Sequence, residues 1–134
     1  MVALAKQRYP AQNWLVGGFP QSVPSGALYD TFVFNGSIQF FRDTRQTLEE
    51  AASFLRPGGR IVLTHVNGAK FVEDECKKNP AVAVRTMPNN LNLDTMVKLV
   101  GLNILENSVF LGEYDGSLDG DSDDFYLGAL EKAA

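Results

Sequence analysis

Continuous apolar runs alternate with amphipathic stretches over much of the chain. Thr31–Phe34 and Ile61–Leu63 are apolar, β-branched or aromatic throughout, which is typical of strands buried on both faces of a parallel sheet. Trp14–Val16 is a shorter run that predicts another strand. Phe19–Gly26 holds two Pro, two Ser and one Gly, so it predicts a loop.

The clearest helix begins after Asp43, which is placed to act as an N-cap with Gln46 three residues on in the capping-box position. Four apolar residues then recur at the i, i+3, i+4, i+7 spacing of one buried helix face: Leu48, Ala51, Ala52 and Leu55. The Pro57-Gly58-Gly59 stretch is predicted to end this helix, because Pro cannot continue it and Gly accepts a positive φ.

The remaining pattern predicts helices over Ala3–Arg8, Gly68–Lys78 and Asp94–Val100, and strands over Ile104–Leu111 and Phe125–Leu130. Strands and helices alternate early in the chain, which predicts an α/β fold with a mostly parallel sheet. A loop without a helix joins the last two strands, so one of them should run antiparallel.

Composition narrows the class of protein. The 134 residues fit one domain, and 45% hydrophobic residues are enough for a core. The net charge of −4 argues against nucleic-acid binding. The sequence lacks an apolar run of about 18 residues, so no transmembrane segment is expected, which leaves docking to a membrane complex open. One cysteine and no signal-peptide pattern at the N-terminus predict a soluble, reducing compartment, either the cytoplasm or an organelle stroma or matrix.

The sequence predicts no metal site. One histidine and one cysteine cannot supply the four ligands of a structural zinc site. The acidic stretch Asp115–Asp124 begins like a calcium loop, but its twelfth position is Tyr126, where a bidentate Glu is needed. Cys76 has acidic neighbours that raise a thiol pKa, so it is not expected to be a nucleophile.

Four segments resemble the class I S-adenosylmethionine-dependent methyltransferases: Tyr29–Asn35 (YDTFVFN), Leu55–Leu63 (LRPGGRIVL), Val100-Gly101-Leu102 and Phe125–Leu130. The resemblance implies a partial Rossmann-like methyltransferase fold, a mostly parallel sheet with an antiparallel C-terminal strand pair. The family's strand order is 3-2-1-4-5-7-6, and the resemblance implies that residues 1–134 form one methyltransferase-like domain that lacks the first two strands.

The resemblance also points to cofactor residues. The family binds its cofactor through a glycine-rich loop, commonly G-x-G-x-G, and this sequence has no such motif. Gly18 stands where the family often has an Asp that contacts the adenine. Asn35 and Gly36 are placed by the resemblance at the cofactor and substrate cleft, at the carboxyl end of a strand. The alternative is a plain turn, since Asn-Gly is a frequent turn pair.

Two further residues are candidates. His65 follows the strand Ile61–Leu63 and is suited by its pKa to act as a general base on a methyl acceptor. The alternative is a structural histidine held by hydrogen bonds. Asp30 opens its strand at the end away from the cleft, which favours local capping or pairing.

The sequence leaves two main functions open. Taken as complete, the chain is expected to be a non-catalytic accessory or structural subunit of a larger assembly, with no cofactor of its own. Another protein chain is then expected to cover the open edge strand Thr31–Phe34. The alternative is a fragment of a soluble methyltransferase acting on a small molecule with S-adenosylmethionine, with Asn35 and His65 facing the acceptor. An unrelated α/β fold with similar turns is a third hypothesis.

Overall fold

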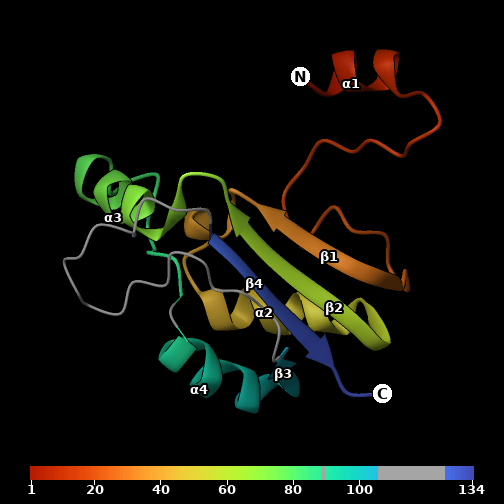
Figure 1. Cartoon of the computed structure of the whole chain (residues 1–134). Coiled ribbons are helices and arrows are strands. Elements are labelled where there is room, and N and C mark those ends of the chain that lie inside the picture. Colours follow the sequence, from red (N-terminus) through yellow and green to blue (C-terminus); the bar gives the residue numbers. More distant parts are fainter. Residues whose placement is uncertain (89, 106–125) are drawn as a thin grey trace.

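The computed structural model describes residues 1–88, 90–105 and 126–134. Its helices are α1 (Val2–Arg8), α2 (Thr44–Ser53), α3 (Gly68–Lys78) and α4 (Asn90–Val100), with a short 3-10 helix η1 (Ile38–Phe40). Its strands are β1 (Tyr29–Asn35), β2 (Leu55–His65), β3 (Leu102–Ile104) and β4 (Tyr126–Lys132). These strands form one sheet in the order β1-β2-β4-β3 (Figure 1). The α/β class is confirmed, and so are the strands predicted over Thr31–Phe34, Ile61–Leu63 and, from Tyr126 on, Phe125–Leu130.

The sheet mixes parallel and antiparallel pairing as the sequence predicted. β1 runs parallel to β2, with Phe32 opposite Ile61 and Phe34 opposite Leu63. β4 runs antiparallel to both of its neighbours, and Leu130 lies opposite Ile61. The antiparallel C-terminal pair is therefore confirmed. In the predicted strand Ile104–Leu111, residues 106 to 111 lie outside the described part of the chain.

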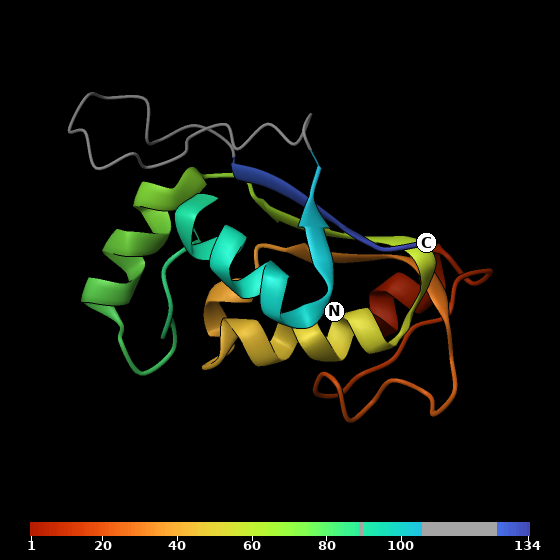
Figure 2. The ribbon, with the colours of Figure 1, turned by 90° about the horizontal axis from the view of Figure 1, so that it is seen from below.

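One face of the sheet carries the hydrophobic core. The buried side chains of this face come from all three long strands and pack on α2 and α4, which lie on the same side of the sheet (Figure 2). They are Phe34, Ile61, Leu63, Tyr126 and Leu130, and they meet Leu48, Ala51, Ala52 and Val97 of the two helices. Burial removes this apolar surface from water, which is the main driving force for the fold.

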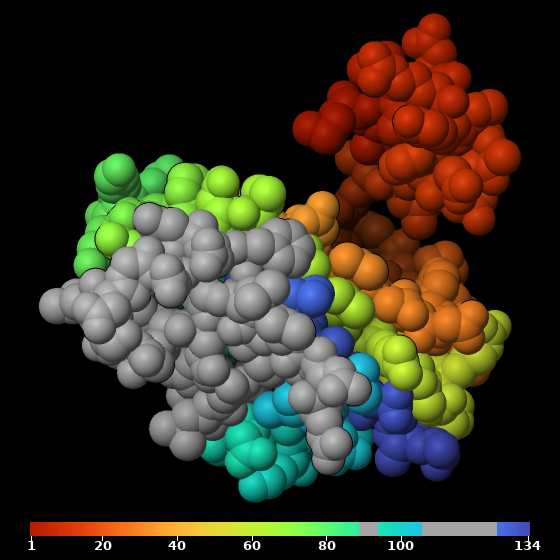
Figure 3. All heavy atoms as spheres, in the orientation of Figure 1, coloured from red at the N-terminus to blue at the C-terminus, as the bar shows by residue number. Residues whose placement is uncertain are grey.

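The opposite face of the sheet is more open in the described residues. Val33 of β1 is 59% exposed, and its neighbour Val62 is half-buried. Atoms of β1, β2 and β4 reach the molecular surface on this face (Figure 3). The expectation that the strand Thr31–Phe34 is buried on both faces is therefore wrong for these residues, because burial alternates along β1.

Helix α2 begins as predicted but ends earlier. Oδ1 of Asp43 accepts a hydrogen bond from Gln46 N at 3.0 Å, which confirms the N-cap. The Gln46 side chain donates instead to Glu50. The helix ends at Ser53, so the prediction that Pro57-Gly58-Gly59 ends it is wrong. That stretch belongs to β2, where Gly58 has a φ of 78° beside a register shift in the pairing with β1.

The N-terminal region departs most from the sequence-based expectation. Helix α1 forms as predicted, buries no residue and stands apart from the sheet (Figure 1). The prediction of a strand over Trp14–Val16 is wrong. A strand needs hydrogen bonds to a neighbouring strand, and in the described chain this segment instead makes a local one, from Trp14 Nε1 to Tyr9 O at 2.9 Å. Within the described ranges, no helix is long and apolar enough to cross a membrane.

Candidate functional site

The carboxyl ends of the parallel strands β1 and β2 are joined by polar contacts. Asn35 lies opposite Thr64 in the register, and Thr64 Oγ1 donates a hydrogen bond to Asn35 Oδ1 at 2.9 Å. One residue on, Gly36 N donates to Thr64 O at 2.7 Å. The exposed side chain of Asn35 thus has its oxygen engaged, and the group it offers to a ligand is its amide N–H.

The backbone conformation at position 36 favours a glycine. Its φ is 62°, and an added Cβ would meet nothing within 4 Å. A left-handed conformation favours glycine even where space is open. Its carbonyl accepts a hydrogen bond from Gln39 Nε2 at 3.1 Å. Gly36 therefore makes the turn that leads from β1 into η1, at the edge of the sheet where ligands bind in open α/β folds.

His65 ends β2 next to Thr64 but is only 6% exposed. Its Nδ1 accepts a hydrogen bond from Asn67 N at 3.2 Å, and its ring packs on Phe71 with the centroids 5.5 Å apart. Burial lowers the pKa of His65, and the charge of Glu75 opposes this in part. The neutral ring then carries its proton on Nε2 and acts as a donor. This arrangement favours a structural role, and the catalytic role stays a prediction.

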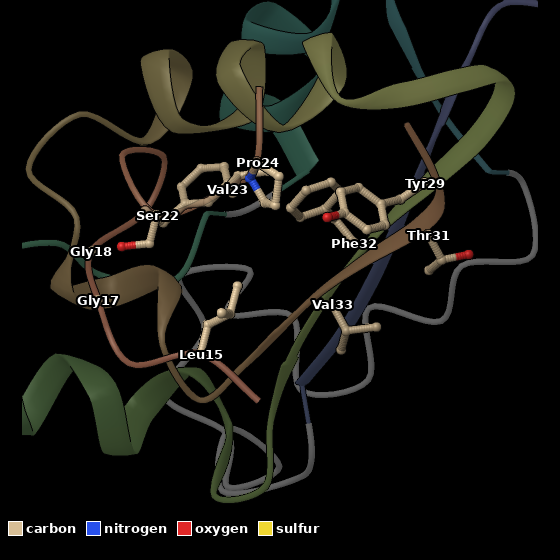
Figure 4. Close-up of a pocket in the computed structure, with 11 residues that line it drawn as sticks. Leu15, Gly17, Gly18, Ser22, Val23, Pro24, Tyr29, Thr31, Phe32 and Val33 are labelled. Carbon is tan, nitrogen blue, oxygen red and sulfur yellow. The ribbon is translucent and has the colours of Figure 1, made fainter. Parts of the chain in front are cut away.

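Gly18 belongs to a pocket that Asn35 does not line. It lines a pocket of about 370 Å³ between the loop that follows Trp14 and the edge of β1. Figure 4 shows Gly17 and Gly18 on one side and Thr31 and Val33 on the other. The other lining residues are Leu15, Phe19, Ser22, Val23, Pro24, Tyr29 and Phe32. Because Asn35 and His65 do not line this pocket, the described structure does not bring the four predicted site residues together.

Two residues missed as important by the sequence analysis shape this loop. A Cβ on Gly17 would lie 1.8 Å from Ser22 Oγ, so no larger residue fits there without a shift. Phe19 packs edge-on against the rings of Phe34 and Phe41, with centroids 5.6 and 6.1 Å apart. An aromatic residue next to Pro20 in an otherwise small and polar segment is the signal that could have revealed this anchor.

Cys76 is the one cysteine of the chain, and its thiol is held by a hydrogen bond. Cys76 Sγ donates to the carbonyl of Arg85 at 3.3 Å. Burial raises the pKa of the Cys76 thiol, and the charges of Glu75 and Glu73 raise it further, which disfavours the thiolate. No group of three or more potential metal ligands occurs in the portion of the chain that the structure covers. The acidic stretch Asp115–Asp124 lies outside the described residues.

The residues at the predicted cofactor positions make up only part of a nucleoside-binding site. Asn35 offers one amide, Gly36 and Gly18 offer no side chain, and Asp30 lies at the opposite end of β1. A ribose is usually held by a carboxylate that accepts its two hydroxyl protons. Neither Asp30 nor any of the three predicted cofactor positions, Gly18, Asn35 and Gly36, supplies that carboxylate at the carboxyl edge, so these residues do not fit the cofactor without further groups.

No family sequence model matches the chain, and no curated protein sequence matches it. Solved structures do. The YcgJ protein from Bacillus subtilis matches with a TM-score of 0.68 and 14% identity, over 98% of this chain and 76% of that chain. The N-methyltransferase NodS from Bradyrhizobium japonicum WM9 matches at 0.60 and 16%, over 99% and 68%, and also as its complex with S-adenosyl-L-homocysteine.

A third match is a complex of the Haloferax volcanii Trm112 methyltransferase activator with a putative methyltransferase, at a TM-score of 0.63 and 16% identity. It covers 90% of this chain and 61% of that chain. The present chain thus spans between 61% and 76% of the length of these structures. At such identities the likeness shows the fold: the chain has the Rossmann-like α/β fold of the class I S-adenosylmethionine-dependent methyltransferases.

Proposed function

We propose that the chain serves as a non-catalytic subunit with a methyltransferase-like fold in a larger protein assembly, where an extended segment of another protein chain covers the edge of β1. The observation that carries this proposal is that the free edge of β1 has almost no charged residues. Within the described sheet, β1 pairs with β2 on one side only. Asp30 is the sole charged residue between positions 9 and 41. Edge strands of monomers usually carry charges or other devices that block further pairing.

Exposed apolar side chains beside this edge support the proposal. Val33 of β1 is largely exposed, and so is Leu15, which lines the same pocket of about 370 Å³. The next residue, Val16, is also largely exposed. An added strand would hydrogen-bond to the β1 backbone and would place alternate apolar side chains in this pocket, which is how peptides commonly add to a sheet edge. The partner expected from this chemistry is an extended, apolar protein segment and not a nucleic acid.

The proposal includes a location. The single cysteine, Cys76, fits an assembly in a reducing compartment, namely the cytoplasm, an organelle stroma or a matrix. Attachment of that assembly to a membrane complex through the partner chain is compatible with this proposal.

Amide hydrogen exchange tests the proposed partner contact. We expect the Thr31–Phe34 amides that point away from β2 to exchange rapidly in the isolated chain and slowly in the native assembly. Val33→Lys should weaken incorporation into the assembly by about tenfold or more, because a buried unpaired charge is costly. The matched control is Val66→Lys, at a position that is 70% exposed and follows the end of β2, outside the pocket beside β1. Equal exchange in both states, or normal incorporation of Val33→Lys, would contradict the proposal.

A second candidate function is a part of a methyltransferase that acts on a small molecule. It is favoured by the position of Asn35 and Gly36 beyond the carboxyl end of β1, where ligands bind in open α/β sheets. S-adenosylmethionine binding would then require a glycine-rich loop and a carboxylate from a further segment.

Titration of S-adenosyl-L-homocysteine into the native assembly separates the two candidates. Saturable binding that shifts the Asn35 and Gly36 amide resonances, and that Asn35→Ala weakens, would support the methyltransferase. Absence of binding together with protection of the β1 edge would support the non-catalytic subunit.

A further inference from the structure

A second pocket, of about 420 Å³, lies where the chain enters α2, and three arginines line it. Arg42 precedes the helix, Arg45 lies in its first turn, and Arg85 follows α3. The other lining residues are Asp43, Thr44 and Met96. None of these residues lines the pocket beside β1, so this site is separate from the proposed partner contact.

The buried residue Gln39 holds the two arginine-bearing segments together. Its carbonyl accepts hydrogen bonds from Val84 N and Arg85 N, both at 3.1 Å. Its side-chain Nε2 donates to Gly36 O at 3.1 Å, and its exposed fraction is only 1%. The backbone of Arg85 is therefore fixed against the segment that runs from β1 into α2. Two segments far apart in the sequence thus bring their arginines to one pocket, and backbone contacts hold these segments together.

The charge of the pocket is opposite to that of the chain. Three arginines and one aspartate line it, whereas the whole chain has a net charge of −4. Arg56 and Arg60 form ion pairs elsewhere, with Asp30 and Glu131. Among the described residues, no ion pair joins the three pocket arginines to a carboxylate.

The carboxylate in the pocket is already engaged in capping. Asp43 Oδ1 accepts the hydrogen bond from Gln46 N, and this contact orients the Asp43 side chain toward the first turn of α2. Arg85 Nη1 donates to Val84 O at 3.1 Å, which leaves further N–H groups of the same guanidinium for a ligand, since each guanidinium carries five.

We propose that this pocket binds the phosphate group of a small molecule, a phosphate monoester. Guanidinium groups bind phosphate oxygens through paired, charge-assisted hydrogen bonds. The first turn of α2, a helix of 10 residues, adds backbone N–H groups and the positive end of the helix dipole, and Thr44 adds a hydroxyl. The volume exceeds that of a phosphate ion, and Met96 gives an apolar contact for the organic part of an ester.

Titration calorimetry on the full chain tests this site with inorganic phosphate and glycerol 3-phosphate as probes. We expect one saturable site with a Kd of about 1 mM or below, and tighter binding of the ester. Arg42→Gln, Arg45→Gln and Arg85→Gln should each weaken binding by about fivefold or more. The matched control is Arg8→Gln on α1, which removes the same charge away from the pocket and should leave the affinity within about twofold.

A variant that removes a negative charge from the pocket should strengthen binding, an effect that misfolding would not produce. Asn is as good an N-cap as Asp, so Asp43→Asn should keep α2 intact and tighten phosphate binding by about threefold. Unchanged affinity in all three pocket variants, or an equal loss in Arg8→Gln, would overturn the proposal. So would a glutamate-rich peptide that binds when neither phosphate nor glycerol 3-phosphate does, because the pocket would then be a contact for an acidic protein segment.

Discussion

The hydroxyl of Tyr126 donates a hydrogen bond to the backbone carbonyl of Pro88 at 2.6 Å, in a buried position. Tyr126 begins β4 and lies opposite His65 in the antiparallel pair with β2, while Pro88 belongs to the segment before α4. This contact ties the last strand to a connection 38 residues earlier. It closes the core at the end of the sheet where β2 ends.

Removal of this hydroxyl is the first prediction. Tyr126→Phe keeps the ring and leaves the Pro88 carbonyl without this donor, so we expect the free energy of unfolding to fall by about 1–3 kcal/mol. Urea denaturation followed by circular dichroism measures the change. Tyr9→Phe, at an exposed position on the chain after α1, is the matched control and should change the unfolding energy by less than about 0.5 kcal/mol. Equal stabilities of the two variants would contradict this account.

A pH dependence follows from His65, whose pKa in the folded chain is lowered mainly by burial. The unfolded chain then binds more protons than the folded chain at pH values between the lowered pKa and the ordinary value of about 6.5. Stability therefore rises with pH in this window. The contribution of His65 is fully present above about pH 6.5 and is lost as the pH falls through the folded pKa.

Urea denaturation at several pH values between about 5 and 7 tests this prediction. The His65→Gln variant cannot titrate there, and its stability should depend less on pH than that of the wild type. An NMR titration of the ring gives the folded pKa directly. A steeper dependence in His65→Gln, or a folded pKa above the ordinary value, would contradict the assignment of His65 as a buried, neutral residue.

Most of the fold could be predicted from patterns of neighbouring residues. The predictions that failed concern segments whose conformation depends on contacts with distant parts of the chain. β1, β2 and α2 could be predicted because apolar runs and the cap at Asp43 are properties of neighbouring residues. The strand over Trp14–Val16 was wrong because strand formation depends on a neighbour that sequence periodicity does not reveal. The Pro57-Gly58-Gly59 stretch was misassigned because its pairing with β1 decides its conformation.

The same distinction between local and distant contacts applies to the candidate sites. Asn35 and Gly36 could be placed at the carboxyl end of a strand, because the end of an apolar run marks that edge. The cluster of Arg42, Arg45 and Arg85 could not, since it depends on backbone hydrogen bonds from Gln39 to a distant segment. Gln39 is polar, so the pattern of apolar residues along the sequence does not reveal that it is buried.

The tight contact between Gly17 and Ser22 gives the last prediction. A Cβ on Gly17 would lie 1.8 Å from Ser22 Oγ and 2.7 Å from Ser22 Cβ, so Gly17→Ala must displace the loop that lines the pocket beside β1. We expect a loss of about 1–3 kcal/mol of unfolding free energy. Removal of the obstructing side chain should relieve the clash, so the double variant Gly17→Ala, Ser22→Gly should regain much of that loss. A double-mutant cycle measures this coupling. Strict additivity of the two changes would mean that Gly17 is needed for its backbone and not for the space that it leaves to Ser22.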